Sequence, residues 1–340
     1  MDSKNENDKL SQLSGKVKTP VFLLGAPRSG TSLAYSVLLV SGQFPHYKAE
    51  THLLDICKPL YGDISNRRKR DRFLCGWVAS QQFRRSGLDG ARFLDSANRH
   101  FANYGEFLGM FMEQVARAQG KERWLEKTPE HIFEVRNLVE WFPDARFLHV
   151  IRDGRDVALS LRNKGWVSSR SSDPVYQLIS AARFWYRAME FGNWLRDAAG
   201  DRYMEFRYED LVCRNQKLLD RLNAFIGTDL DYQQIDREGD GALRSGDTTY
   251  DQSMVGLSKK GVYRWEREMS EPEKQIITSC LEEMLKEKGY STELSGAGVG
   301  LVARLKSRMA WWGNGVAISA KYWLRHNTFL GRYSARKLEV

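Results

Sequence analysis

A short glycine-containing segment near the start of the chain has the residue types that bind a phosphate group. Gly25 ends an apolar run, and Gly30, Thr31 and Ser32 follow shortly after it. Such a loop between a strand and a helix turns backbone N–H groups toward an anion, and the helix N-terminus adds partial positive charge. Arg28, inside the loop, supplies a full cation. The segment therefore predicts a phosphate-binding loop, with a tight ligand-free turn as the alternative.

One residue of this loop departs from the nucleotide-binding pattern that the loop otherwise follows. The P-loop pattern places a lysine directly before its final Ser or Thr, and this chain has Thr31 at that place. Because that lysine contacts the β- and γ-phosphates, its absence favours a nucleotide without a γ-phosphate.

Two further cations follow short apolar runs directly. Lys127 comes after the run 123–126, and Arg152 comes after the run 146–151, with Ser160 farther along. Arginine offers a bidentate fork to a phosphate, and serine offers a hydroxyl donor. In open α/β sheets the carboxyl ends of the strands hold the ligand. If the runs are parallel strands, both cations lie at the ligand-binding edge; the alternative is a capped helix start with a surface arginine.

The chain around these residues alternates between short apolar runs and helical patterns. Strands are expected at 21–25, 123–126, 146–151 and 203–207, each followed by a helix, and the stretch 51–119 has helical composition. Thr128 and Asp173 suit helix N-caps because each precedes a proline. The Gly-rich, charged stretch 236–247 is expected to be a loop. The alternation predicts an α/β fold of three layers, with a central parallel sheet and helices on both faces.

Taken together, these segments resemble the sulfotransferases that use 3′-phosphoadenosine 5′-phosphosulfate (PAPS), above all the bacterial, carbohydrate and tyrosylprotein enzymes. The stretch 27–31 is similar to their 5′-phosphosulfate loop, and Arg152 with Ser160 is similar to their 3′-phosphate site. The resemblance covers residues 21–290 and implies a P-loop NTPase-like fold, PAPS as co-substrate and the desulfated nucleotide PAP as product. It assigns to cofactor binding Arg28, Ser29, Gly30, Thr31, Ser32, Arg152, Ser160, Tyr208, Lys259, Lys260 and Gly261.

The same resemblance provides candidates for the transfer step. Lys127 is similar to the lysine that contacts the transferring sulfuryl group, and Glu50 falls where these enzymes place a catalytic glutamate. The acceptor hydroxyl needs a base within hydrogen-bond reach, for which Glu50 comes first and His52 second. Lys127 and Arg28 are expected to stabilise the charge that grows as the bond breaks. Because a sulfuryl group carries less charge than a phosphoryl group, no metal is expected.

The composition excludes several classes of protein and concentrates positive charge at one end. The 340 residues are 42% hydrophobic and 28% charged, as in an ordinary globular protein rather than a disordered or disulfide-scaffold chain. Of the formal charge of +9, the stretch 295–340 contributes +7, from eight Lys or Arg and one Glu. The rest is nearly neutral, which argues against nucleic acid as a partner. We expect a disordered segment at 1–16, a sulfotransferase domain at 17–294 and a basic, aromatic tail at 295–340.

The tail and the acceptor leave alternatives open. An N-terminus without an apolar leader and the absence of a run near the roughly 20 apolar residues of a membrane span predict a cytoplasmic protein. Aromatic residues among the tail's cations favour peripheral membrane contact, whereas the alternative is a terminal helix on the domain, which Gly313 and Gly315 would interrupt. The acceptor stays open among small phenols, sugars, glycolipids and protein tyrosines. The competing functions are a P-loop-type nucleotide or small-molecule kinase and a non-catalytic nucleotide-binding protein.

Overall fold

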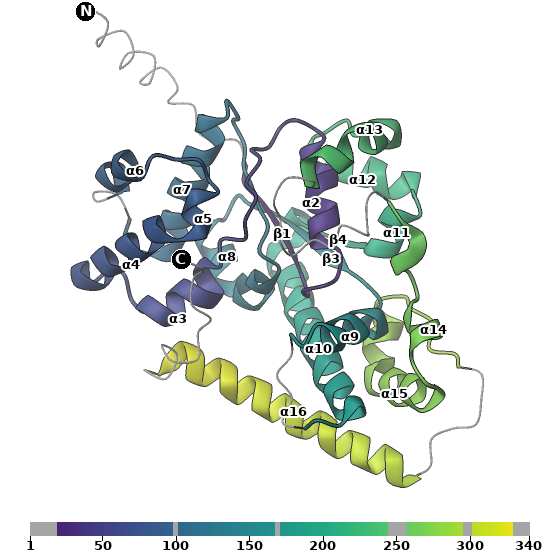
Figure 1. Ribbon diagram of the computed structural model, residues 1–340. Helices are drawn as coiled ribbons and strands as arrows, with labels where there is room; N and C mark the ends of the chain where they lie inside the picture. Colours follow the sequence, from purple (N-terminus) through teal and green to yellow (C-terminus); the bar gives the residue numbers. More distant parts are fainter. Residues whose placement is uncertain (1–18, 98–100, 167–170, 244–256, 295–300, 329–340) are drawn as a thin grey trace, which may run out of the picture.

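A parallel four-stranded sheet forms the centre of the structure, which is a computed structural model (Figure 1). The strands are β1 (Val21–Gly25), β2 (Leu125–Glu126), β3 (Arg146–Ile151) and β4 (Tyr203–Arg207), and they pair in the order β2-β1-β3-β4. The predicted strands are confirmed, with β2 shorter at its start than expected. The structure describes residues 19–97, 101–166, 171–243, 257–294 and 301–328.

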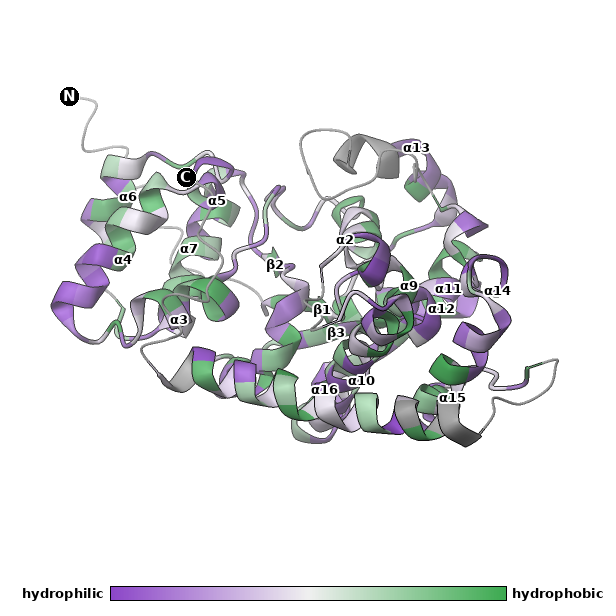
Figure 2. Ribbon diagram, turned by 60° about the horizontal axis from the view of Figure 1, so that its bottom comes forward, coloured by the Kyte–Doolittle hydropathy of each residue, from purple (hydrophilic) through white to green (hydrophobic). Residues whose placement is uncertain are grey.

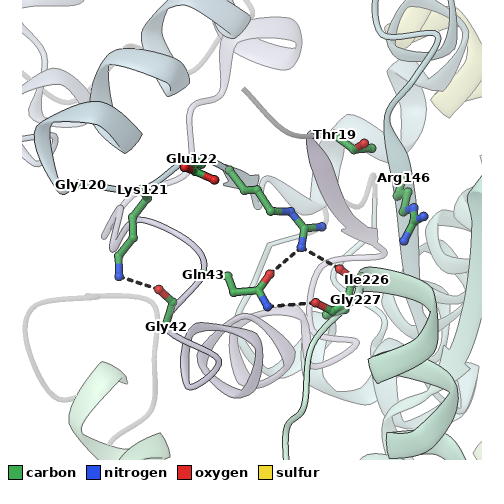
Figure 3. Close-up of a pocket in the computed structure, with 10 residues that line it drawn as sticks. Thr19, Gly42, Gln43, Gly120, Lys121, Glu122, Arg146, Ile226 and Gly227 are labelled. Carbon is green, nitrogen blue, oxygen red and sulfur yellow. Dashed lines mark hydrogen bonds between the residues drawn. The ribbon is translucent and has the colours of Figure 1, made fainter. Parts of the chain in front are cut away.

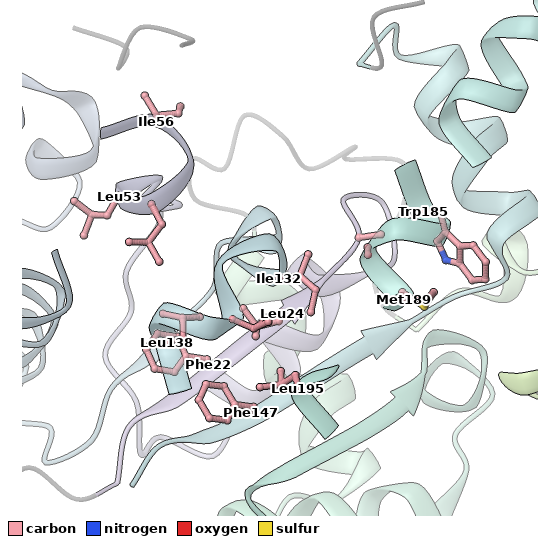
Figure 4. Packing of buried hydrophobic residues seen from close by; sticks show 14 of the residues in the cluster. Phe22, Leu24, Leu53, Ile56, Ile132, Leu138, Phe147, Trp185, Met189 and Leu195 are labelled. Atoms are coloured by element: carbon pink, nitrogen blue, oxygen red, sulfur yellow. The ribbon is translucent and has the colours of Figure 1, made fainter. Parts of the chain in front are cut away.

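A hydrophobic core lies on each face of the sheet, because successive strand residues point to opposite sides. Phe22 and Leu24 belong to the first core, which Figure 4 shows in part, and Val21 and Leu23 belong to the second. The first core is lined by α8 (Val135–Trp141), α9 (Gly154–Asn163), α10 (Pro174–Ala199) and α15 (Glu271–Glu287). The second is lined by α2 (Thr31–Leu39), α11 (Tyr208–Val212), α12 (Gln216–Ile226) and α13 (Tyr232–Leu243). The three-layer architecture is therefore as the sequence predicts.

Between α2 and β2 the described regular structure is helical, as the composition of 51–119 predicts, and loops join the helices. It contains the π-helix η1 (Leu53–Cys57), α3 (Lys58–Tyr61), α4 (Arg67–Ala79), α5 (Gln81–Arg84), α6 (Gly90–Ala97) and α7 (Tyr104–Ala118). Aromatic rings fix these helices to one another: Phe73 meets Phe107 at 4.7 Å and Trp77 meets Phe111 at 5.2 Å between ring centroids. This helical layer carries the chain from the end of α2 back to the sheet.

Two helix starts differ from the predictions and a third agrees with them. Thr128 was expected to cap a helix, but its hydroxyl donates to the Glu126 carboxylate, and a 3₁₀-helix, η2 (Pro129–Glu134), precedes α8. Helix α9 begins at Gly154 rather than near Val157, because Asp153 accepts a hydrogen bond from the Arg155 backbone N–H. The Asp173 cap of α10 is confirmed by bonds from two backbone N–H groups.

The last third of the chain gives two corrections. The stretch expected to be a loop at 236–247 is helical as far as Leu243, within α13, and its residues from 244 lie outside the described part. The chain also forms η3 (Gly200–Arg202), η4 (Lys259–Gly261) and α14 (Trp265–Glu268). The last described helix is α16 (Leu301–Asn327), which is continuous through Gly313 and Gly315. At Gly315 a Cβ would lie 2.9 Å from the Arg183 Nε, so close packing on α10 outweighs the low helix propensity of glycine.

Candidate active site

The carboxyl ends of the four strands bring most of the predicted site residues together. β1 runs into the glycine loop, β2 into Lys127, β3 into Arg152 and β4 into Tyr208. All pairs of neighbouring strands are parallel, so these four ends share one edge of the sheet. The edge therefore holds the predicted phosphate-binding loop and the two cations that follow strands.

The glycine loop between β1 and α2 has a strained backbone that only certain residues tolerate. Arg28 and Gly30 both have positive φ angles, of 73° and 94°. A Cβ at Gly30 would collide with the ring of Tyr208, so glycine is required there by space as well as by conformation. Thr31 is buried, and its methyl group lies beside Gly25. Tyr208 is thus packed directly against the loop that the sequence identifies as a phosphate cradle.

The two segments that the sequence assigns to a nucleotide are joined by hydrogen bonds. The Arg28 Nε donates to the Ser160 Oγ at 3.1 Å, and the Arg152 Nη1 donates to the Arg28 carbonyl at 3.1 Å. The guanidinium of Arg152 lies 4.6 Å from the Tyr208 ring centre and donates to the Gly261 carbonyl. One basic cluster therefore spans the loop after β1, the start of α9 and the turn η4.

Two buried polar atoms of this cluster have no hydrogen-bond partner in the described part of the chain. They are the Ser29 Oγ and the Arg152 Nε, and both residues are nearly fully buried. A buried donor without a partner costs about 1–3 kcal/mol, which a bound anion would recover. The chemistry of these groups fits a phosphate or sulfate ester.

The other charged residues of the β3–α9 junction are structural. Arg155 forms an ion pair with Asp153 at 2.7 Å and stacks on the Trp265 ring at 3.8 Å. Asp156 accepts a hydrogen bond from the Trp265 backbone N–H at 2.9 Å. These contacts fix Trp265, the first residue of α14, against α9. Because η4 ends only four residues before Trp265, they also keep the Gly261 carbonyl near Arg152.

The segment 259–261 reaches the basic cluster only through its backbone. The carbonyl of Gly261 contacts Arg152, whereas Lys259 and Lys260 have exposed side chains. The structure thus brings Gly261 to the predicted cofactor site and leaves the two lysines at its rim.

On the β2 side of the same edge, Lys127 and Glu50 form a close ion pair. Their Nζ and Oε1 atoms are 2.7 Å apart, and Nζ is 3.5 Å from the Ser32 Oγ of α2. His52 lies on the other side of Glu50, with Nε2 3.3 Å from Oε2, and its Nδ1 is 3.0 Å from an Asp55 oxygen. A row of alternating charges, Lys127–Glu50–His52–Asp55, therefore leads away from the loop.

A buried polar network holds this row against β2. The Thr51 backbone N–H donates to Thr128, and the Thr51 hydroxyl donates to Glu126 at 2.8 Å. His131 reaches Glu126 with Nδ1 at 3.2 Å, and its Nε2 accepts from the Leu54 N–H at 3.4 Å. His52 itself has a positive φ of 49° at the entrance of η1. The network and this turn place Glu50 and His52 beside Lys127.

The charges within this row shift the pKa values of Glu50 and His52 in opposite directions. Burial alone would raise the pKa of Glu50, but the charge of Lys127 and hydrogen bonds from His52 lower it to about 2. Burial would lower the pKa of His52, yet Asp55 and Glu50 raise it well above its usual value. These shifts favour a Glu50 carboxylate beside a His52 imidazolium, an arrangement in which Glu50 rather than His52 would accept a proton.

Sequence reasoning missed Glu130, which lies beside this row. Burial and then the charge of Glu50 raise the pKa of Glu130 to about 7, and its Oε2 is buried without a hydrogen-bond partner among the described residues. The only sequence signal was its place just after Lys127, at the end of a strand. Asp55 was also missed, because its contact with His52 depends on the π-helix.

The spacing of three of these groups would also suit a metal ion. Ligand atoms of Glu50, His52 and Glu130 lie within 4.8 Å of one another. Two of the three already have ionic partners, since Glu50 is paired with Lys127 and His52 with Asp55. The donor set therefore fits proton handling better than it fits a resident cation.

A separate hollow of about 580 Å³ lies at the opposite edge of the sheet (Figure 3). Residues before or at the starts of strands line it, among them Thr19, Arg123 and Arg146. Arg123 donates to the Gln43 side chain at 2.6 Å and to the Ile226 carbonyl at 2.7 Å, which ties β2 to α12. None of the predicted site residues lines this hollow.

Comparison with known proteins connects the chain to one family. The model of the sulfotransferase family matches residues 20–232. Two relatives, from Mycobacterium bovis and Mycobacterium tuberculosis, are named omega-hydroxy-beta-dihydromenaquinone-9 sulfotransferase Stf3. Each is 30% identical over 139 residues, which are 38% of this chain and 35% of the relative. The chain thus spans about a third of the length of the curated relatives that it matches.

Solved structures show the same fold. The sulfotransferase domain from the curacin biosynthetic pathway superposes with a TM-score of 0.54 at 14% identity, over 82% of this chain and 99% of that domain. The sulfotransferase domain of the Synechococcus PCC 7002 olefin synthase gives a TM-score of 0.53 at 18% identity, over 88% and 96%. The expectation of a three-layer, P-loop NTPase-like fold is confirmed.

Proposed function

The chain belongs to the sulfotransferase family, and on that premise we propose that it transfers a sulfuryl group from PAPS to an acceptor hydroxyl. The observation that carries the donor assignment is the bond between the two nucleotide segments, Arg28 to Ser160 and Arg152 to the Arg28 carbonyl. A site for a single phosphate needs only the loop. A second basic element beside it has a use when the nucleotide carries a second, separate phosphate.

The donor is assigned to the basic cluster in two parts. The backbone of the loop, with Ser29, Thr31 and Ser32, takes the 5′-phosphosulfate. Arg152 and Ser160 take the 3′-phosphate. The Arg152 Nε and the Ser29 Oγ, which have no hydrogen-bond partner in the described part of the chain, supply donors for these anions. The ring of Tyr208 lies on the adenosine side, and the segment 259–261 closes over the 3′-phosphate.

The transfer step uses the row on the β2 side. The acceptor oxygen attacks sulfur in line, a new S–O bond forms, and the S–O bond to the 5′-phosphate breaks to release PAP. Lys127 and Arg28 stabilise the negative charge that grows on the sulfuryl and bridging oxygens. The proton of the acceptor hydroxyl passes to Glu50.

Because Lys127 is paired with Glu50, the donor must bind before Glu50 becomes an effective base. While the ammonium group stays 2.7 Å from the carboxylate, the pKa of Glu50 is held at about 2 and Glu50 is a weak base. A sulfuryl group at the loop would draw Lys127 toward itself, which removes the main cause that lowers this pKa. Donor binding therefore makes Glu50 a stronger base at the moment when the hydroxyl must lose its proton.

The acceptor is proposed to be a hydroxyl group on a small, lipid-like molecule. The two curated relatives carry a hydroxylated menaquinone derivative in their names, and their match covers a third of their length. A sugar, a glycolipid headgroup or a phenol offers the same attacking group. The acceptor hydroxyl is therefore expected to lie beside Glu50 and His52. An acceptor screen identifies the molecule that carries this hydroxyl.

An acceptor screen with ³⁵S-labelled PAPS tests the proposal. Extracted lipids, oligosaccharides and phenols are incubated with the full chain, and labelled products are identified by mass. Transfer of label to a hydroxylated lipid is the expected result. Magnesium-dependent turnover of ATP without sulfate transfer would instead favour the kinase alternative, and nucleotide binding without any transfer would favour a non-catalytic protein.

A further inference from the structure

Helix α16 lies along one side of the molecule and packs on it with a single face (Figure 1). Trp311 meets the Tyr186 ring at 5.4 Å, and the Asn314 side chain accepts a hydrogen bond from Ser180 at 2.9 Å. Farther along, the Tyr322 hydroxyl donates to the Phe133 carbonyl at 3.0 Å. These residues recur at helical spacing, and they join α16 to α10 and η2.

The opposite face of α16 is an exposed apolar stripe, and Figure 2 shows hydrophobic residues alternating with hydrophilic ones along this helix. Its side chains are large, and several are mostly exposed: Met309 at 75%, Trp312 at 70% and Val316 at 69%. Leu305 and Trp323 continue the stripe at the same helical spacing. Among the described residues, six of the seven exposed large hydrophobic side chains lie on this helix. A concentration of this kind marks an interaction surface rather than ordinary scatter.

The charge of α16 indicates what this stripe contacts. The helix contains five Lys or Arg and no acidic residue, and no Asp or Glu occurs anywhere from 294 to 338. The described cations Arg308 and Lys321 have exposed side chains. A second copy of the same helix would bring like charges together, whereas an anionic lipid surface complements them. No helix among the described residues is long and apolar enough to cross a bilayer, so a lipid contact here would be peripheral.

The far end of α16 adjoins the proton-handling row of the active site. Tyr322 also donates to the Glu134 carboxylate, and the charge of Arg325 is one of the causes that lower the pKa of Asp55. Asp55 in turn pairs with His52, beside Glu50. The basic cluster for the nucleotide lies across the site, on the β3 and β4 side.

We propose that α16 docks on an anionic membrane surface through the stripe formed by Leu305, Met309, Trp312, Val316 and Trp323. The apolar side chains enter the boundary between headgroups and acyl chains, and the cations of the helix, such as Arg308 next to Met309, add electrostatic attraction to the anionic surface. Docking holds the acceptor side of the site near the bilayer, where a lipid-borne hydroxyl would arrive. This last consequence rests on the proposed function, whereas the docking itself does not.

Vesicle flotation of the full chain tests the docking without any turnover. Vesicles of phosphatidylcholine with phosphatidylglycerol are compared with vesicles of phosphatidylcholine alone. The full chain is expected to float with the anionic vesicles and to be released by high salt, because surface attraction is screened over about 8–10 Å at physiological ionic strength. Replacing the stripe (Met309→Gln, Trp312→Gln, Val316→Gln) should weaken partitioning by at least about tenfold.

Two matched controls separate docking from damage to the fold. The conservative set Met309→Leu, Trp312→Phe, Val316→Ile should retain binding. Removing two cations from the helix (Arg308→Gln, Lys321→Gln) should weaken binding, whereas removing two exposed cations from α4 (Arg67→Gln, Arg68→Gln) should not. Affinity for PAP, measured by calorimetry, should be the same in all of these variants.

The outcomes are distinct. Equal flotation with neutral and anionic vesicles, or unchanged flotation of the glutamine variant, overturns the proposal. The proposal is also overturned if the stripe instead forms a dimer interface. In that case light scattering would show the mass of the glutamine variant to be half that of the unmodified protein, while vesicle binding would not change. If PAP does not bind but flotation is lost only when the stripe is replaced by glutamine, the docking proposal is supported and the proposed function is wrong.

Discussion

The two halves of the site share one edge of the sheet but differ in charge. On the β3 and β4 side, Arg28, Arg152 and Ser160 form a basic cluster, in which the Arg152 Nε has no hydrogen-bond partner among the described residues. On the β2 side, carboxylates alternate with Lys127 and His52, so almost every charge is compensated within the protein. An excess of donors favours binding of a multiply charged anion, whereas compensated pairs favour movement of a proton. The first half should therefore govern nucleotide affinity and the second should govern turnover.

The largest expected effect is on Lys127, which belongs to the turnover half. Lys127→Ala should lower the sulfotransfer rate about 100-fold or more, because it removes a preorganised charge stabiliser. PAP affinity should change little, since Lys127 acts on the transferring group. Rates with saturating PAPS and calorimetric PAP affinities measure the two effects. Lys121→Ala, at the opposite edge of the sheet, is the matched control. A large loss of PAP affinity in Lys127→Ala would contradict the assignment of nucleotide affinity to one half of the site and turnover to the other.

A similar but smaller loss is expected for the proposed base. Glu50→Gln keeps the shape of the side chain but removes the carboxylate that accepts the proton, so the rate should fall by about 10²-fold or less, with PAP affinity retained. His52→Ala should lower the rate less, because a histidine that is already protonated cannot act as the base. Full activity of Glu50→Gln together with an inactive His52→Ala would assign the base to His52.

The pH dependence of stability tests the electrostatics of the turnover half. The pKa of Glu130 is about 7 in the folded chain. This lies above the roughly 4.3 of an unfolded chain, so Glu130 contributes stability that is present below about pH 4 and is lost as pH rises through 7. Glu130→Gln should make the free energy of unfolding fall less between pH 5 and 8, by about 2–3 kcal/mol. Urea titrations of both proteins across this range measure the difference, and parallel curves would contradict the assignment.

The smallest expected effect is that of removing metals. Because Glu50 and His52 already have ionic partners, turnover should be unchanged after dialysis against EDTA. Sulfotransfer that is abolished by the chelator and restored by one divalent cation would show that Glu50, His52 and Glu130 hold a metal.

The sequence predicted, for a physical reason, which cations meet at one edge of the sheet. Arg28, Lys127 and Arg152 each follow a buried strand, and a parallel sheet places such residues at one edge whatever the rest of the chain does. The turnover half depends on the turn at His52 and on the π-helix after it, which no pattern in the sequence specifies. Glu130 was missed for that reason. In α16, glycine propensity predicted a break, but packing against Arg183 made a continuous helix.

The central claim is that the basic cluster binds a nucleotide through its 3′-phosphate. Calorimetry with PAP and AMP tests it directly, because the two ligands differ only in that group. PAP should bind about 10- to 150-fold more tightly, as expected for about 1.5–3 kcal/mol from one charge-assisted hydrogen bond. Ser160→Ala should reduce this preference, whereas Ser96→Ala, a helix serine far from the site, should leave it intact. Equal affinities for PAP and AMP in the unmodified protein would contradict the account.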